Sequence, residues 1–335
     1  MGVLVVGMHR SGTSALSSVV EATGLDAGTD LMARDVGNPD GYYEQRAVVA
    51  LDDEVLAHYG GSWDAPPLLA PGWAEENVAR GFASRAREVV DATFSRSRFV
   101  MKDPRVSLLL PLWRHVVLDR CAAVVIVRDP AEVAWSLALR DAMSPLSAMA
   151  LWSAYNRALL DGLEGLPVHV VRYADLVERP SAVVGEIIAS LRDWGEIDGD
   201  VDEVSAAARI KPDLRRNTHP GSEGPLATPP MEIRDLDDFL GGLQGRHDSF
   251  AATSPPRAGW WEAALLDERR TVRQNAEARV ADIESQRDDV IRDNEALRAQ
   301  SAELRREMEA ALAALKEMRE AHSTSRWDRL AGRGR

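Results

Sequence analysis

The chain begins with a glycine-rich loop between an apolar run and an amphipathic stretch, VLVVGMHRSGTSALSSVV over residues 3–20. Gly7 and Gly12 have the spacing of a phosphate-binding loop, GxxxxGK[ST], whose backbone amides hold phosphates and whose lysine neutralises them. Thr13 occupies the lysine position, and Arg10 brings a cation into the loop instead. Loop amides, a helix N-terminus and a planar guanidinium suit a tetrahedral oxyanion. We therefore predict an anion-binding loop made of His9, Arg10, Ser11, Gly12, Thr13 and Ser14.

Two more cationic residues end apolar runs that are typical of buried strands. Lys102 follows RFVM, and Arg128 follows AVVIV. Ser136 comes eight residues after Arg128, with a proline between them where a helix is expected to start. A tight turn and two helical turns can direct Arg128 and Ser136 at one phosphate. Each residue also has an alternative without a ligand. Arg128 could pair with Asp129 or Glu132, Ser136 could be an ordinary helix hydroxyl, and Lys102 could be a solvated lysine at a strand end.

Short β-branched runs alternate with amphipathic stretches through the first two thirds of the chain, which predicts an α/β fold with a P-loop NTPase-like parallel sheet flanked by helices. The predicted strands are Val3–Gly7, Arg98–Asp103, Ala123–Asp129 and Val168–Tyr173. The predicted helices are Thr13–Thr23, Glu44–Tyr59, Glu75–Phe94, Ala131–Asp141, Ser147–Leu163 and Ser181–Trp194. Open α/β sheets bind ligands at the carboxyl ends of their strands. The polar residues that end these strands should therefore face one crevice.

The bulk composition limits the function classes. The 335 residues are 45% hydrophobic and 28% charged, enough for one α/β core and an appendage. A net charge of −13 argues against a general nucleic-acid binder or a binder of anionic membranes. Cys121 is the single cysteine and lies in an apolar run, which excludes a disulfide framework, a zinc cluster and a CxxC site. With neither an 18-residue apolar run nor a charged leader, we expect no membrane span and a cytoplasmic protein.

The amino-acid composition changes after residue 217. The segments NTHPGSEGPLATPP and TSPPRAGWW are rich in Pro, Gly, Ser and Thr and predict a linker over 218–261. A run without Gly or Pro follows, which predicts a coiled coil over 262–321 and a basic tail over 322–335. A chain that ends near Gly259 should therefore still fold and change only its oligomeric state.

A heptad register fits the second half of that run, although Arg287 interrupts the a column. Asn294 at an a position favours a parallel dimer, because two such amides can hydrogen-bond across the seam. A homodimer, another protein as the partner, and a single amphipathic helix folded against the main domain all stay open. The a positions are Val280, Asn294, Ser301, Met308 and Leu315, and the d positions are Ile283, Val290, Leu297, Leu304, Ala311 and Met318.

Four motifs occur in a fixed order within residues 1–217: GMHRSGTSAL, NPDGYYEQR, MKDPR and VIVRDPAEVAWSL. Together they resemble the bacterial branch of the sulfotransferase superfamily, whose members use 3′-phosphoadenosine 5′-phosphosulfate (PAPS) and need no metal. The resemblance implies a sulfotransferase domain over 1–217 that moves a sulfuryl group to a hydroxyl. Adenosine 3′,5′-bisphosphate (PAP) would be the product.

The resemblance also implies roles for the residues singled out above. The loop from Arg10 to Ser14 would bind the 5′-phosphosulfate, while Arg128 and Ser136 would hold the 3′-phosphate. Arg10 and Lys102 would stabilise the leaving phosphate. His9 lies too near the loop to be a general base and is assigned to the cofactor site.

A glutamate near the second motif takes the acceptor proton in related enzymes, which points to Glu44. It would need an apolar setting, such as Tyr42 and Tyr43 provide, to become basic enough. An acid that only interacts with the dipole of a helix is the alternative for Glu44. Asp64, in GGSWDAPP, is the second candidate for the base.

The acceptor is predicted to be a saccharide or glycolipid, because Trp63 and Trp73 could stack on sugar rings. Two other functions remain open. A metal-dependent kinase or NTPase would use the same kind of loop, but it needs the lysine that Thr13 replaces and a set of magnesium ligands. A non-catalytic nucleotide-binding scaffold with a coiled coil would have both anion sites and no base.

Overall fold

The computed structural model describes residues 2–33, 41–117, 121–211 and 228–331, with side chains as far as residue 321. The chain divides into two units, Met1–Thr271 and Val272–Arg335. Three predicted features lie outside the described residues: positions 38–40 of the second motif, residues 212–227 around the predicted domain boundary, and the side chains of the tail 322–335.

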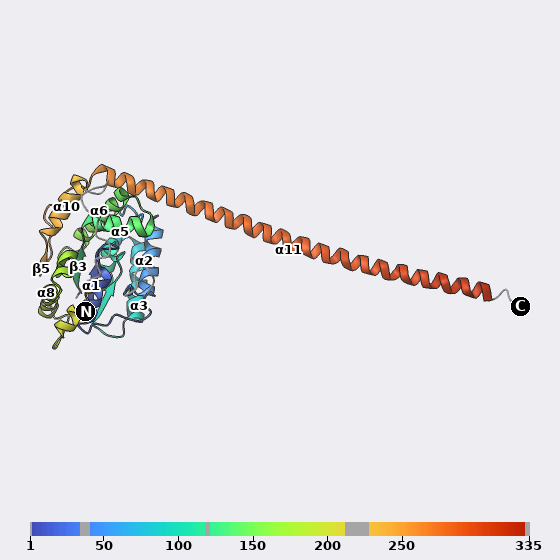
Figure 1. Cartoon of the computed structure of the whole chain (residues 1–335), viewed down its shortest axis with the longest axis horizontal. Coiled ribbons are helices and arrows are strands. Elements are labelled where there is room, and N and C mark those ends of the chain that lie inside the picture. The colour runs from blue at the N-terminus through green and yellow to red at the C-terminus, as the bar shows by residue number, and fades with distance from the viewer. Residues whose placement is uncertain (1, 34–40, 118–120, 212–227, 332–335) are drawn as a thin grey trace. The chain divides into compact units, whose positions relative to one another are not determined.

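A sheet lies at the core of the first unit (Figure 1), and its strand order is β2-β1-β3-β4-β5. The strands β1 (Gly2–Val6), β2 (Phe99–Lys102), β3 (Cys121–Val127) and β4 (Val168–Arg172) are parallel, and they confirm the four predicted strands within one or two residues. All four are almost wholly buried, as parallel strands covered on both faces should be. Their carboxyl ends therefore lie along one edge of the sheet.

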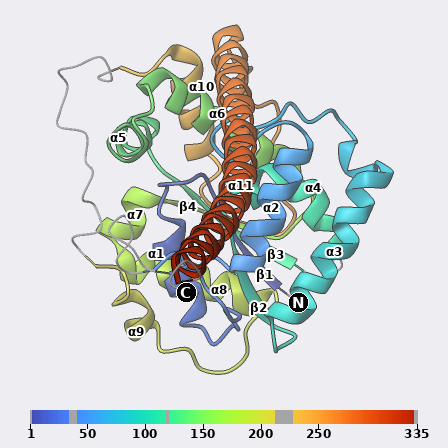
Figure 2. The ribbon, with the colours of Figure 1, turned by 90° about the vertical axis from the view of Figure 1, so that its right-hand side faces the viewer.

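Helices cover both faces of this sheet (Figure 2). Alternate residues of β1 belong to different cores: Val3 and Val5 face one layer, and Leu4 and Val6 face the other. The Val3 layer holds α1 (Thr13–Glu21), α7 (Tyr173–Glu178), α8 (Pro180–Asp193) and α9 (Glu203–Ala207). The Leu4 layer holds α2 (Arg46–His58), the short helix η1 (Trp73–Glu75), α3 (Asn77–Thr93), α4 (Val106–Val117), α5 (Pro130–Asp141) and α6 (Pro145–Gly162).

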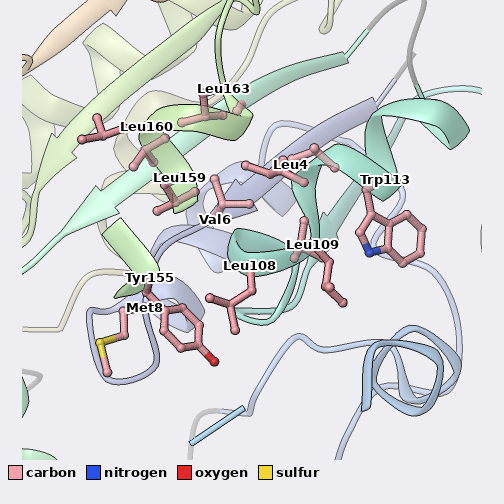
Figure 3. Packing of buried hydrophobic residues seen from close by; sticks show 14 of the residues in the cluster. Leu4, Val6, Met8, Leu108, Leu109, Trp113, Tyr155, Leu159, Leu160 and Leu163 are labelled. Atoms are coloured by element: carbon pink, nitrogen blue, oxygen red, sulfur yellow. The ribbon is translucent and has the colours of Figure 1, made fainter. Parts of the chain in front are cut away.

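The larger core brings together side chains from distant parts of the sequence (Figure 3). Trp113 of α4 is fully buried, and its indole N–H donates to Asp52 Oδ1 at 2.8 Å, so the buried polar atom has a partner. Trp73 also lies in this core, at 5% exposure, and so it cannot stack on a sugar as predicted. Cys121 is buried as expected, and burial raises the pKa of its thiol to about 11.

Part of the predicted linker 218–261 is ordered core instead. Residues Met231–Gly241 form α10, whose Ile233, Leu236 and Leu240 are buried. Gly245–His247 form β5, which pairs antiparallel with β4, so the sheet is parallel in four strands and not in the fifth. Neither element was predicted from the sequence. The helix is short and lies between Pro- and Gly-rich stretches, and β5 is a polar edge strand that forms only through its pairing with β4.

One helix, α11 (Trp260–Ala331), covers the predicted coiled coil and part of the tail. Its first three turns, through Thr271, belong to the first unit. Leu266 and Glu262 are buried there, which the coiled-coil prediction from residue 262 did not anticipate. None of the described helices is both long and apolar enough to cross a membrane.

Candidate active site

The strand order changes direction at β1, where phosphate binding is expected. From β1 the chain moves to β2 on one side, then crosses to β3 on the other side of β1. Ligands of open α/β sheets bind at such a switch point, outside the carboxyl ends of the two strands. The anion-binding loop follows β1, and Arg128 follows β3. The fold thus brings the two predicted anion-binding segments to the same place.

The loop after β1 has a left-handed backbone at two positions. Arg10 has φ 68° and Gly12, which precedes α1, has φ 96°. A Cβ on Gly12 would lie 2.4 Å from the Tyr173 ring, and one on Gly7 would lie 2.5 Å from the carbonyl oxygen of Ile126. Both positions therefore require glycine, as in a loop that must approach its ligand with bare backbone.

The first turn of α1 carries no negatively charged side chain. Thr13 is its first residue, and the first turn contains no acidic side chain that would compete for the positive end of the dipole. The Gly7 amide donates to Ser107 Oγ at 3.1 Å, and that hydroxyl donates back to the Gly7 carbonyl at 3.3 Å. Ser107, in the first turn of α4, therefore fixes the base of the loop.

Arg10, Arg128 and Ser136 form one cluster. Arg10 Nε donates to Ser136 Oγ at 2.8 Å, and Arg128 Nη1 donates to the Arg10 carbonyl at 3.0 Å. Arg128 also pairs with Glu132 at 2.8 Å and lies over the Tyr173 ring at 4.4 Å. Glu132, one of the alternative partners predicted for Arg128, is thus its partner here, and Ser136 accepts from Arg10. Separately, the Asp129 carboxylate caps α5 by accepting from the amides of Ala131 and Glu132.

Positive charge accumulates around the loop. The pKa of Arg10 lies below its ordinary value because of burial and because the guanidiniums of Arg140 and Arg128 are close. Arg140 lies one helical turn after Ser136 on α5, and this i, i+4 spacing could have identified it from the sequence. Arg128 and Arg140 are each paired with a carboxylate of α5, Glu132 and Asp141, so their charges are partly neutralised before any ligand binds.

Lys102 connects the end of β2 with the loop. Its ammonium contacts Glu44 Oε1 at 2.5 Å, the Tyr42 carbonyl at 2.9 Å and Ser14 Oγ at 3.4 Å. Both side chains of the ion pair are buried, with 2% exposed for Lys102 and 9% for Glu44. Gln45 supports the pair, since its Oε1 accepts from the Lys102 amide. Lys102 is therefore not the solvated lysine of the alternative prediction.

Asp64, the second candidate for the base, is held by other groups. Arg269 of α11 donates to Asp64 Oδ2 at 2.6 Å, and the Ser62 hydroxyl donates to Oδ1 at 2.8 Å. The neighbouring Trp63 accepts a bond from the Tyr155 hydroxyl at 2.7 Å through its carbonyl. Both carboxylate oxygens of Asp64 thus serve to join residues 62–64 to the first turns of α11.

His9 lies on the inner side of the loop. Its ring lies 4.6 Å from that of Trp63 and 5.7 Å from that of Tyr155, and its Nε2 is buried with no hydrogen-bond partner in the described structure. Burial, followed by the charges of Arg105 and Arg140, holds the pKa of His9 well below its usual range. The imidazole is therefore neutral at pH 7 and packs against the rings of Trp63 and Tyr155.

Within the ranges that the structure describes, no three His, Cys, Asp or Glu side chains are grouped so that they could hold a metal ion. Sequence reasoning missed Ser107, Gln45 and the Tyr42 carbonyl. The first two are polar residues that become buried and central only through tertiary contacts, and the carbonyl leaves no sequence signal.

No protein-family model and no curated protein matches the chain. Among solved structures, the sulfotransferase domain of the olefin synthase of Synechococcus PCC 7002 is 17% identical with a TM-score of 0.38, and the match covers 80% of this chain and 94% of that domain. The sulfotransferase domain from the curacin biosynthetic pathway is 14% identical with a TM-score of 0.35, covering 80% and 96%. A sulfotransferase from Alicyclobacillus acidocaldarius is 16% identical with a TM-score of 0.31, covering 62% and 93%. This chain is therefore structurally similar to sulfotransferase domains, at low identity.

Proposed function

We propose that the protein is a sulfotransferase that transfers a sulfuryl group from PAPS to a hydroxyl acceptor. The observation that supports this most is the set of cations around a loop that lacks the lysine of nucleoside triphosphatases. Arg10 from the loop after β1, Lys102 as the last residue of β2 and Arg128 after β3 come from three strand ends, and each contacts the loop or belongs to it. A nucleotide that carries one anionic group at its 5′ end and another at its 3′ end could contact all three cations.

The residues present fit the two ends of PAPS. The glycine-constrained loop and the start of α1 would hold the 5′-phosphosulfate, because bare backbone and a helix N-terminus bind oxyanions. Arg128 and Ser136 would hold the 3′-phosphate, with the guanidinium exchanging its contact with Glu132 for the ligand. His9, packed under the loop, would keep the loop in shape.

The transfer breaks the bond between sulfur and the oxygen that bridges to phosphorus, and it forms a bond between sulfur and the acceptor oxygen. Arg10 and Lys102 would neutralise the charge that develops on the bridging oxygen. Glu44 would accept the acceptor's proton. The Glu44 carboxylate lies 2.5 Å from the Lys102 ammonium, so Lys102 would turn towards the leaving oxygen as Glu44 takes the acceptor's proton.

Glu44 suits this role better than Asp64 does. Glu44 contacts Lys102, which also reaches Ser14 of the loop, whereas both oxygens of Asp64 are engaged by Ser62 and Arg269. The saccharide or glycolipid acceptor now rests on Trp63 alone, since Trp73 is in the core. The Trp63 ring already contacts His9 and lies 5.4 Å from the Arg140 guanidinium.

The two other functions make different demands. A kinase or NTPase would use Thr13 where its loop needs a lysine. A binding scaffold would need no carboxylate beside the loop, yet Glu44 is buried against Lys102 at a desolvation cost. The buried ion pair therefore favours an enzyme over a scaffold.

The test is a binding titration with PAP, AMP and ATP, each with and without magnesium. PAP should bind without magnesium and more tightly than AMP, by a factor between about 10 and 150, because charge-assisted contacts to one phosphate contribute about 1.5–3 kcal/mol. Arg128→Ala should remove most of that difference and leave AMP affinity unchanged. Equal affinity for PAP and AMP in the unaltered protein, or tighter binding of ATP with magnesium, would contradict the assignment.

A further inference from the structure

The second unit presents a narrow apolar stripe along α11. The large apolar side chains at its a and d positions are exposed, from 55% for Val280 to 73% for Met318. The stripe repeats every seven residues over six heptads. A seven-residue repeat drifts around a straight helix by roughly 20° per heptad, so it stays on one side only if two helices wind around each other with a left-handed supercoil. The seven-residue pattern therefore indicates that the stripe packs against a partner helix with the same period.

We propose that this stripe binds a second copy of the same chain, as a parallel, in-register, two-stranded coiled coil over residues 280–318. This proposal concerns the assembly of the chain and does not depend on its catalytic activity.

The charges beside the stripe favour that partner and that direction. In a parallel homodimer each g residue faces the e residue five positions later on the other helix. Arg279 then faces Glu284, and Asp293 faces Arg298, while none of the remaining g–e pairs between 286 and 319 joins like charges. An antiparallel pair would instead place e residues opposite e residues. When the two helices overlap over 280–318, Arg298 then lies opposite Arg298 or Arg305 of the other helix, so antiparallel pairing brings like charges together there.

Asn294 specifies the register. It stands at an a position between Val290 and Leu297 at d. In a parallel in-register pair the two Asn294 amides meet and bond to each other, whereas a shift by one heptad would place each against an arginine or a serine. An a-position asparagine also favours two strands over three or four at some cost in stability. Arg287 adds a further cost at the preceding a position, and its Nη2 pairs with Asp288 on its own helix at 2.8 Å.

Two matched cysteine variants test direction and register. The chain has a single native cysteine, Cys121, which is buried and will not interfere. Ala311→Cys places a thiol at a d position, and Ala313→Cys places one two residues later at the outward f position. A parallel in-register pair brings the two thiols introduced at position 311 within disulfide reach of each other, so mild oxidation should give a covalent dimer with Ala311→Cys and little or none with Ala313→Cys.

The oligomeric state is measured on the full chain by light scattering after gel filtration. The expected mass is twice the chain mass of 36.7 kDa. Leu297→Asp combined with Leu304→Asp should give the monomer, whereas Ala299→Asp combined with Ala313→Asp, the same charges at f positions, should leave the dimer intact.

Four outcomes would overturn the proposal: a monomeric unaltered chain, a trimer or tetramer, a dimer that survives the substitutions at 297 and 304, or equal crosslinking at 311 and 313. An unchanged midpoint of thermal unfolding of the first unit in the monomeric variant shows that this unit is still folded. A loss of dimer is thereby distinguished from general unfolding.

Discussion

The Glu44 carboxylate is the residue on which the proposed chemistry depends most. Glu44→Gln keeps shape and hydrogen bonding but cannot accept a proton, so turnover should fall by roughly 10² to 10⁴. It also leaves Lys102 buried without its counter-ion, and breaking such a pair costs about 3–5 kcal/mol. The measurement is steady-state turnover with PAPS and a hydroxyl acceptor, with PAP affinity measured in parallel to show that the variant is folded.

Asp64→Asn is the matched comparison for Glu44→Gln. It should retain turnover, because Asp64 is committed to Ser62 and Arg269. If Asp64→Asn were inactive and Glu44→Gln near normal, the base would be Asp64, and the contact with Arg269 would have to open during the reaction.

Lys102 and Arg10 should differ from Arg128 and Ser136, which are proposed only to bind the cofactor. Both should act on charge that develops as the leaving oxygen departs, so Lys102→Met and Arg10→Ala should each lower kcat by about 10² to 10³. PAP affinity should change less than kcat does. Lys211→Met, at an exposed position, is the control for Lys102→Met. Normal turnover in Lys102→Met would make Lys102 a purely structural cation that holds Glu44 and Tyr42.

At the scale of elements, the first turns of α11 act as an anchor. Arg269 pairs with Asp64, Arg270 Nη1 donates to the Pro66 carbonyl at 2.8 Å, and Leu266 is 7% exposed. These contacts join α11 to the segment that includes Trp63, which in turn packs on His9 beneath the loop. The boundary predicted at residue 262 therefore cuts through the first unit.

Two truncations measure this anchor. A chain that ends at Thr271 should unfold at the same temperature as the dimer-deficient full chain. A chain that ends at Gly259 loses the burial of Leu266, about 1.5–3 kcal/mol, and the contacts of Arg269 and Arg270. Its midpoint in thermal unfolding should be lower by about 5–10 °C. Equal midpoints for the two truncated chains would show that the anchor adds nothing to stability.

At the scale of the whole molecule, one buried carboxyl should shape how stability depends on pH. Glu196 is 4% exposed, its Oε2 has no hydrogen-bond partner within the described structure, and burial raises its pKa to about 7. A carboxyl whose folded pKa exceeds its unfolded value of about 4.3 stabilises the fold while protonated. That contribution is complete at low pH, declines as the pH rises from about 4.3 towards 7, and is absent above it.

Glu196→Gln removes the cost of ionising this group. The variant should match the parent near pH 4.5 and exceed its free energy of unfolding at pH 8 by on the order of 3 kcal/mol, measured by urea denaturation across that range. Glu88→Gln, at an exposed position, controls for the loss of one negative charge. A constant difference between Glu196→Gln and the parent at all pH values would contradict the assignment.

The sequence by itself determined the elements whose signal is local. The apolar runs that became β1 to β4 are buried on both faces, so each run identified its strand without knowledge of its neighbours. The glycines of the anion-binding loop were also readable, since the spacing of Gly7 and Gly12 reflects backbone demands within one loop. The heptad repeat of α11 could also be recognised from the sequence, because the spacing of its apolar residues is a property of one continuous helix.

Only the tertiary structure decided which distant groups meet. The pairing of Lys102 with Glu44 and of Arg10 with Ser136 depends on strand order, which places β1 between β2 and β3. The same holds for β5, whose polar residues form a strand only because β4 offers a free edge to pair with. The pairing of Asp64 with Arg269 likewise joins residues 205 positions apart in the sequence. Contacts between residues far apart in the chain leave no periodic trace in a single sequence, because each partner is selected by the fold as a whole.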